Sequence, residues 1–206
     1  MQEKSSWSST ERFNQVAETW DEKPMRVAIA KAVAQAILNH VPLNNDMTAM
    51  EFGCGTGLIS LELSATLKEI VALDTSEQMI NVLRRKITEQ NIPNMTTICA
   101  DLTETPKALS GGKQFHLIYS SMTLHHVMDT EKILTELKRF LLPGGYLAIA
   151  DLDEEDGTFH DDATENVHHG FEREELRLRL EKAGYHNIRF ETAHVIRKQN
   201  RLGEVK

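Results

Sequence analysis

The stretch EFGCGTG, residues 51–57, places a glycine at every second position directly after a short apolar run. Glycine has no Cβ atom, so it tolerates positive φ angles and allows a ligand to approach the backbone closely. Gly53, Gly55 and Gly57 therefore predict a tight turn between a strand and a helix. They also predict that a small molecule lies against this turn.

Short apolar runs alternate with helical patterns through the rest of the chain. The runs are AMEF, EIVALD, TTICAD, FHLIYS and YLAIADL, and IRFETAHVI follows a last helical pattern. Strands that alternate with helices form a mostly parallel sheet with right-handed crossovers and helices on both faces. We therefore predict an α/β fold, a Rossmann-like three-layer sandwich with six to seven strands in the central sheet.

A helical segment precedes the first strand. Phe13 and Trp20 share one face of a first helical pattern, and residues 24–42 form a second pattern bounded by prolines. We divide the chain into an N-terminal helical segment, residues 1–42, and a ligand-binding part, residues 43–206, within one structural domain.

The composition excludes several classes of partner. The 206 residues carry a formal net charge of −8, which disfavours nucleic acid because affinity for a phosphate backbone comes from Lys and Arg. Lys31 and Gln35 interrupt the longest apolar stretch, so no membrane insertion is predicted. The N-terminus lacks the apolar core of a secretory signal, and we expect a cytoplasmic protein. Cys54 and Cys99 lack the spacing of a zinc site.

Two cofactors suit a glycine-rich turn after a first strand, NAD and S-adenosylmethionine. The NAD fingerprint requires glycine at positions one, three and six, but the sixth position counted from Gly53 is Leu58. Asp74 closes the second strand, where a carboxylate can accept the ribose hydroxyls of either cofactor. Asp101, after the third strand, adds an acceptor for an adenine amino group. The spacing and this second acid favour S-adenosylmethionine.

These segments resemble the class I S-adenosylmethionine-dependent methyltransferases, in particular the small-molecule branch that includes quinone-biosynthesis-like enzymes. EFGCGTG resembles their glycine loop, IVALDTSEQMI their ribose-binding segment, CADL their adenine-binding segment and IYSSMTLHHVMD their fourth-strand segment. FNQVAETWD is similar to their helical lid, while only QNRLGEVK remains to form their usual seventh strand. The resemblance implies a methyltransferase that acts on a small-molecule acceptor.

The resemblance also implies a set of cofactor-binding residues. Those beside the methionine part are Glu51, Gly53, Gly55, Gly57 and Ser120. Those around the adenosine are Asp74, Thr75, Met79, Asp101 and Leu102.

The acceptor side is less sharply defined. Trp20 lies in the lid, His125 follows the fourth strand, and His168 and His169 lie in a long loop that holds eight acids between residues 151 and 165. We expect this loop to be an acceptor-side lid and not a metal site; a solvated segment, or the rim of a pocket for a cationic acceptor, are the alternatives. No side chain is assigned as catalytic, although a hydroxyl or amine acceptor would need a base such as His. A non-catalytic S-adenosylmethionine-binding module and an NAD-dependent oxidoreductase remain the alternative functions.

Overall fold

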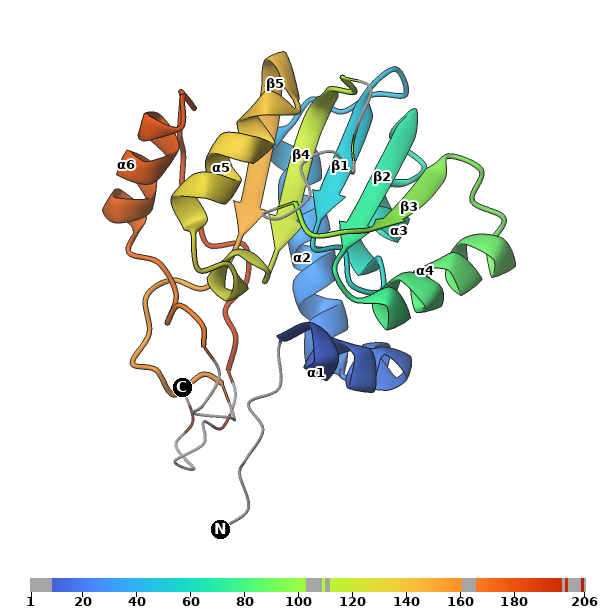
Figure 1. Cartoon of the computed structure of the whole chain (residues 1–206), viewed down its shortest axis with the longest axis horizontal. Helices are drawn as coiled ribbons and strands as arrows, with labels where there is room; N and C mark the ends of the chain where they lie inside the picture. The colour runs from blue at the N-terminus through green and yellow to red at the C-terminus, as the bar shows by residue number, and fades with distance from the viewer. Residues whose placement is uncertain are drawn as a thin grey trace.

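The central sheet has five parallel strands in the order β3-β2-β1-β4-β5 (Figure 1). The computed structural model describes residues 9–102, 109, 112–160, 166–197, 199 and 205. The strands are β1 (Thr48–Phe52), β2 (Glu69–Asp74), β3 (Met95–Cys99), β4 (Phe115–Ser121) and β5 (Leu141–Ala150). The strand order reverses between β1 and β4, so the carboxyl ends of these two strands open a crevice where ligands bind in such sheets.

Helices cover both faces of the sheet, which confirms the predicted sandwich. The helices are α1 (Ser9–Val16), η1 (Ala17–Glu22), α2 (Pro24–His40), α3 (Leu58–Leu63), α4 (Glu77–Glu89), η3 (Leu124–His126), α5 (Thr130–Arg139) and α6 (Arg173–Lys182). The core clusters place α2, α3 and α4 against one face, and α5 and α6 against the other. None of the helices in the described part of the chain combines the length and hydropathy that a bilayer crossing needs.

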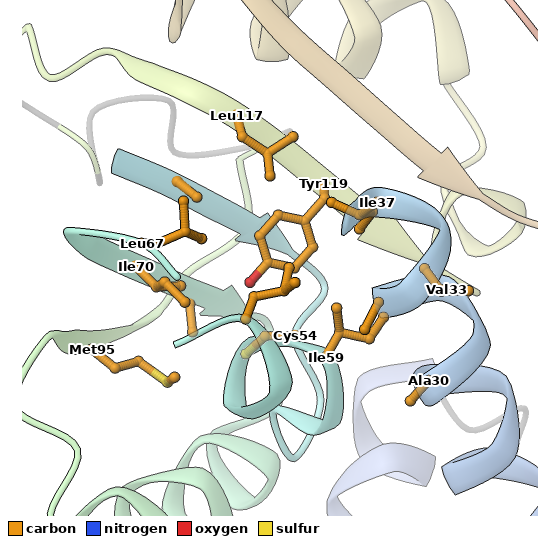
Figure 2. Close-up of a cluster of buried hydrophobic side chains, with 14 of the residues drawn as sticks. Ala30, Val33, Ile37, Cys54, Ile59, Leu67, Ile70, Met95, Leu117 and Tyr119 are labelled. Atoms are coloured by element: carbon orange, nitrogen blue, oxygen red, sulfur yellow. The ribbon is translucent and has the colours of Figure 1, made fainter. Parts of the chain in front are cut away.

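Alternate residues of each strand point into opposite clusters, because side chains alternate across a sheet. Ala49 of β1 and Tyr119 of β4 belong to the cluster under α2, together with Val33 and Ile37 of that helix. Figure 2 shows the Tyr119 ring beside Ile37. Met50 points to the cluster under α5. Strands buried on both faces must be apolar throughout, which is why these runs are readable in the sequence.

The prediction of six to seven strands is wrong in number. Residues 188–197 have the alternation of a half-buried strand, yet they form no ladder with β5. Ile188 and Phe190 pack on the cluster under α5, whereas Ile196 packs on the opposite one. Alternation determines which side chains can be buried, but a strand also needs backbone hydrogen bonds to a neighbour.

The first two helices, α1 and η1, lie beyond the carboxyl ends of the strands (Figure 1) and are called here the N-terminal segment, residues 9–22. Asn14 Oδ1 accepts from Ser76 Oγ at 2.7 Å, and Glu18 forms an ion pair with Arg85 of α4. Ser76 in turn caps α4 by accepting from Met79 N. The N-terminal segment is therefore tied to the beginning of α4, next to the crevice.

Candidate functional site

A cavity of about 770 Å³ lies at the carboxyl ends of the strands, between the N-terminal segment and the loops after β1, β2 and β4. Its volume is within the range of about 300–1,000 Å³ that small-molecule sites occupy. The predicted site residues that line it are Trp20, Glu51, Gly53, Gly55, Asp74, Thr75, Met79, Asp101 and His125. Loops that are far apart in the sequence thus meet at one cavity.

The three glycines of the loop after β1 have positive φ angles of +73°, +52° and +78° but play different parts. A Cβ atom on Gly53 would lie 2.3 Å from the Thr123 side chain, and one on Gly57 would lie 2.3 Å from Leu83 Cδ1. A Cβ atom on Gly55 would meet nothing within 4 Å. Gly53 and Gly57 therefore permit close packing, whereas Gly55 keeps the backbone open to the cavity.

Asp74 joins the end of β2 to the glycine loop. Its Oδ2 accepts from Gly55 N at 2.7 Å, and its Oδ1 accepts from Ser76 N at 2.8 Å. Burial raises the pKa of the Asp74 carboxyl, and these backbone hydrogen bonds oppose that rise. Because each carboxylate oxygen has two lone pairs, both oxygens retain capacity for a further donor. The carboxylate is thus held in a fixed orientation at the cavity wall.

Glu51 is a buried acid, only 2% exposed, in the wall of the cavity. Its Oε2 is hydrogen-bonded by Ser60 Oγ, which also contacts the Tyr119 hydroxyl at 2.6 Å. Desolvation raises the pKa of Glu51 to about 8, and the charge of Asp74 adds to the rise while the Ser60 hydroxyl opposes it. In the absence of a ligand this carboxyl is therefore mostly protonated at neutral pH, and a nearby cation would favour its charged form.

A wall of rings forms the other half of the cavity. It comprises Phe13, Trp20, His125, His126, Phe159 and His160. Phe13 links the two ends of this wall, because its ring centroid lies 5.6 Å from that of Trp20 and 5.2 Å from that of His126. The Arg26 guanidinium stacks over the Trp20 ring at 3.5 Å from the centroid. These contacts give part of the cavity wall an aromatic surface.

The adjacent histidines His125 and His126 have different environments. Their rings are 4.1 Å apart, and the His160 ring packs against both. Burial lowers the pKa of His126 to about 3, with smaller contributions from the neighbouring His125, His160 and Arg12. His126 is therefore neutral at neutral pH, and its buried Nδ1 makes no hydrogen bond within the described residues.

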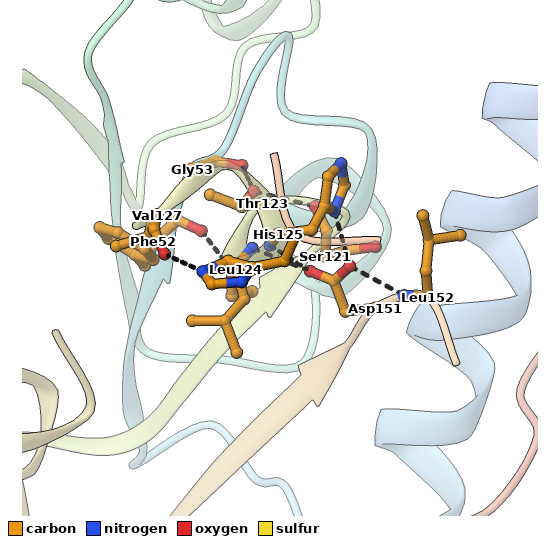
Figure 3. Close-up of polar contacts among 11 residues, drawn as sticks. Phe52, Gly53, Ser121, Thr123, Leu124, His125, Val127, Asp151 and Leu152 are labelled. Atoms are coloured by element: carbon orange, nitrogen blue, oxygen red, sulfur yellow. Dashed lines mark hydrogen bonds and ion pairs between the residues drawn. The ribbon is translucent and has the colours of Figure 1, made fainter. Parts of the chain in front are cut away.

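His125 is instead paired with an acid that the sequence analysis did not single out. Its Nδ1 lies 2.6 Å from Asp151 Oδ1, and both side chains are almost fully buried (Figure 3). Asp151 follows directly after β5, which pairs with β4, and His125 lies in η3 just after β4. The signal that could have identified Asp151 is its position at the end of a strand adjacent to the one that precedes His125.

Five of the predicted site residues do not line the large cavity. Gly57 packs closely against Leu83. Residues 121–123 line the cavity, whereas Ser120, directly before them, does not. Ser120 points inward and donates from Oγ to the Phe52 carbonyl at 2.7 Å. Leu102 is fully buried in the cluster under α5.

His168 and His169 also lie elsewhere. They line a separate, smaller cavity of about 310 Å³ together with Glu154, Glu155 and α6 residues. His168 Nε2 lies 3.1 Å from the Val127 carbonyl oxygen. The loop after β5 reaches the large cavity through Phe159 and His160 instead. No group of three or more His, Cys, Asp or Glu side chains in the described ranges has the geometry of a metal site.

Comparison with known proteins gives one family. A family model described as "Methyltransferase domain" matches residues 50–149, which run from within β1 to the penultimate residue of β5. An uncharacterized methyltransferase of Schizosaccharomyces pombe is 33% identical over 60% of this chain and 45% of its own length. A malonyl-[acyl-carrier protein] O-methyltransferase of Priestia megaterium is 29% identical over 73% of this chain and 52% of its own length.

Solved structures agree with this match. A SAM dependent methyltransferase from Aquifex aeolicus superimposes with a TM-score of 0.60 at 26% identity, covering 73% of this chain and 78% of that one. The chain spans about half the length of the curated relatives it matches.

Proposed function

We propose that this chain is a class I S-adenosylmethionine-dependent methyltransferase and that it transfers a methyl group from S-adenosylmethionine to a small-molecule acceptor in the large cavity. One observation carries the proposal. Asp74 is hydrogen-bonded to Gly55 N, so an acceptor for ribose hydroxyls and an open stretch of backbone form one unit where the strand order reverses.

The residues at this end of the cavity fit S-adenosylmethionine. The cofactor carries an ammonium group, and Glu51 is a buried carboxyl for which no Lys or Arg partner occurs among the described residues. We assign Glu51 to the ammonium, Asp74 to the ribose and Asp101 to the adenine amino group. Gly55 leaves room for the cofactor beside the backbone. When bound, the cofactor supplies an electrophilic methyl carbon.

The chain contributes positioning and exclusion of water. The N-terminal segment, residues 9–22, is the lid in this assignment, because α2 packs in the core through Ile29, Val33 and Ile37. The wall of rings gives the acceptor an apolar surface. Methyl transfer needs the nucleophile in line with the S–CH3 bond at about 3 Å. Holding the two reactants in this geometry can lower the activation free energy by roughly 7–11 kcal/mol.

We further propose that the methylated atom is an oxygen. The relative from Priestia megaterium, which is 29% identical, is named a malonyl-[acyl-carrier protein] O-methyltransferase. The cavity supports oxygen chemistry because its wall of rings includes the imidazole of His125, which can accept a hydroxyl proton.

Incubation with methyl-labelled S-adenosylmethionine and a small-molecule cell extract tests the proposal. We expect a labelled small molecule with the wild type and at least tenfold less with Asp74→Ala at limiting cofactor, because hydrogen bonds to a charged group are worth about 1.5–3 kcal/mol each. Glu62→Gln, which changes an exposed acid on α3, is the matched control. Binding of the cofactor without any labelled product would contradict a transferase and favour a binding module.

A further inference from the structure

We propose that His125 is the base that accepts the proton of a hydroxyl acceptor through Nε2, and that Asp151 is the positioning residue that fixes its imidazole in the tautomer needed. This inference rests on the proposed function, and it names the acceptor class. The acceptor is a hydroxyl that is still protonated at neutral pH, such as a phenol or an enol, and not a carboxylate or a thiolate.

The hydrogen bond between the two side chains determines the tautomer. A neutral imidazole carries one N–H donor and one bare acceptor nitrogen, whereas a carboxylate only accepts. Because His125 Nδ1 lies 2.6 Å from Asp151 Oδ1, Nδ1 must be the donor. Nε2 then carries the free lone pair, and no hydrogen bond to it is found within the described ranges. The ring lines the cavity.

Asp151 is itself held rigidly. Its Oδ2 accepts from Leu124 N at 2.8 Å and from His125 N at 3.3 Å, and its Oδ1 accepts from Leu152 N at 2.8 Å (Figure 3). Three backbone N–H groups thus donate to this one carboxylate. The pair therefore has an orientation set by β5 and η3, and not by flexible side chains.

His126 does not compete with His125 for the proton. His126 and His160 face its ring, and burial makes His126 neutral with a pKa of about 3. The His168 backbone N–H donates to the His125 carbonyl at 2.8 Å and fixes the main chain from the loop after β5. His125 is hydrogen-bonded to the Asp151 carboxylate, whereas the buried Nδ1 of His126 has no hydrogen-bond partner within the described residues.

The chemistry balances with groups already named. The acceptor oxygen forms a bond to the methyl carbon, the C–S bond of the sulfonium breaks, and its electron pair stays on sulfur. The hydroxyl proton moves to His125 Nε2, and the carboxylate of Asp151 stabilises the imidazolium. A carboxylate or thiolate acceptor has already lost its proton, so its methylation would not need a base such as the His125–Asp151 pair.

Nitrogen-15 NMR of the imidazoles tests the tautomer without knowledge of the acceptor. In the neutral wild type we expect His125 with protonated Nδ1 and bare Nε2. In Asp151→Asn, an amide can donate to Nδ1, and the population should shift to protonated Nε2. His125→Gln assigns the signal. A wild type with protonated Nε2, or an unchanged signal in Asp151→Asn, would overturn the inference.

The labelling assay tests the role in turnover. His125→Gln should lower labelling by about a hundredfold or more, and Asp151→Asn should do so comparably, while cofactor affinity by calorimetry stays within about threefold. His169→Gln, on the separate cavity, should label within about twofold of the wild type. A His125→Gln variant that binds the cofactor and labels like the wild type refutes the base but leaves the proposed function intact.

A wild type that labels nothing refutes both. If His125→Gln does not fold, Asp151→Asn and the tautomer of the wild type decide.

Discussion

Glu51→Gln should remove a pH dependence that the buried carboxyl imposes on folding. The pKa of Glu51 rises from an ordinary 4.5 to about 8, chiefly because the group is desolvated. Below about pH 4.5 both the folded and the unfolded chain hold this proton. As the pH rises toward 8 the unfolded chain loses it first, so the free energy of unfolding falls.

The size of the effect follows from the two values. At about 1.36 kcal/mol for each pKa unit, a rise from 4.5 to about 8 corresponds to roughly 5 kcal/mol, and to roughly 3 kcal/mol if the folded value is one unit lower. This is a large fraction of the 5–15 kcal/mol that is typical of a domain. A glutamine has no carboxyl to ionise and keeps an oxygen for the Ser60 hydroxyl.

Urea unfolding without cofactor, at steps from about pH 5 to about pH 8, measures this difference. The stability of Glu51→Gln relative to the wild type should increase by roughly 3 kcal/mol or more over that interval. Glu62→Gln changes an exposed acid on α3, and its free energy of unfolding should vary with pH in parallel with that of the wild type. Parallel curves for Glu51→Gln and the wild type would refute the reasoning on Glu51.

Four further outcomes are expected. Gly57→Ala should lower the free energy of unfolding by more than about 1 kcal/mol, because its Cβ would lie 2.3 Å from Leu83 and its φ is +78°; thermal unfolding measures this. Gly55→Val should instead weaken binding of S-adenosylmethionine in calorimetry, since its side chain would project into the cavity, and unchanged affinity would remove Gly55 from the site. Replacement of His160 by Ala should lower labelling more than the same change at His169, because only His160 lines the large cavity. Chelator should leave labelling unchanged, and loss restored by one divalent ion would reveal a metal site.

The sequence predicted the five strands, of which β1, β2 and β4 are largely buried on both faces and so read as apolar runs. It also indicated Asp74 and Asp101, since an acid at the carboxyl end of a parallel strand necessarily faces the ligand edge of the sheet. The glycine spacing identified the loop, but it could not show that Gly53 and Gly57 serve packing while Gly55 serves the cavity. That distinction depends on Thr123 and Leu83, which are distant in the sequence.

Other features depend on contacts that local patterns do not contain. Ser120 and its neighbour Ser121 differ only in which side of β4 they face, so a shift of one residue decides which reaches the cavity. The loop after β5 offers several histidines, and its path brings His160 to the cavity and takes His169 away. Asp151 becomes significant only when β5 is known to lie beside β4.

Isothermal calorimetry with S-adenosylmethionine and NAD tests the central claim most directly, namely that the cavity beside the glycine loop is a methyl-donor site. We predict that S-adenosylmethionine binds, that NAD does not bind measurably, and that folded Asp74→Ala loses at least about tenfold in affinity for S-adenosylmethionine. Comparable binding of NAD by the wild type, or an affinity for S-adenosylmethionine that Asp74→Ala leaves unchanged, would contradict the account.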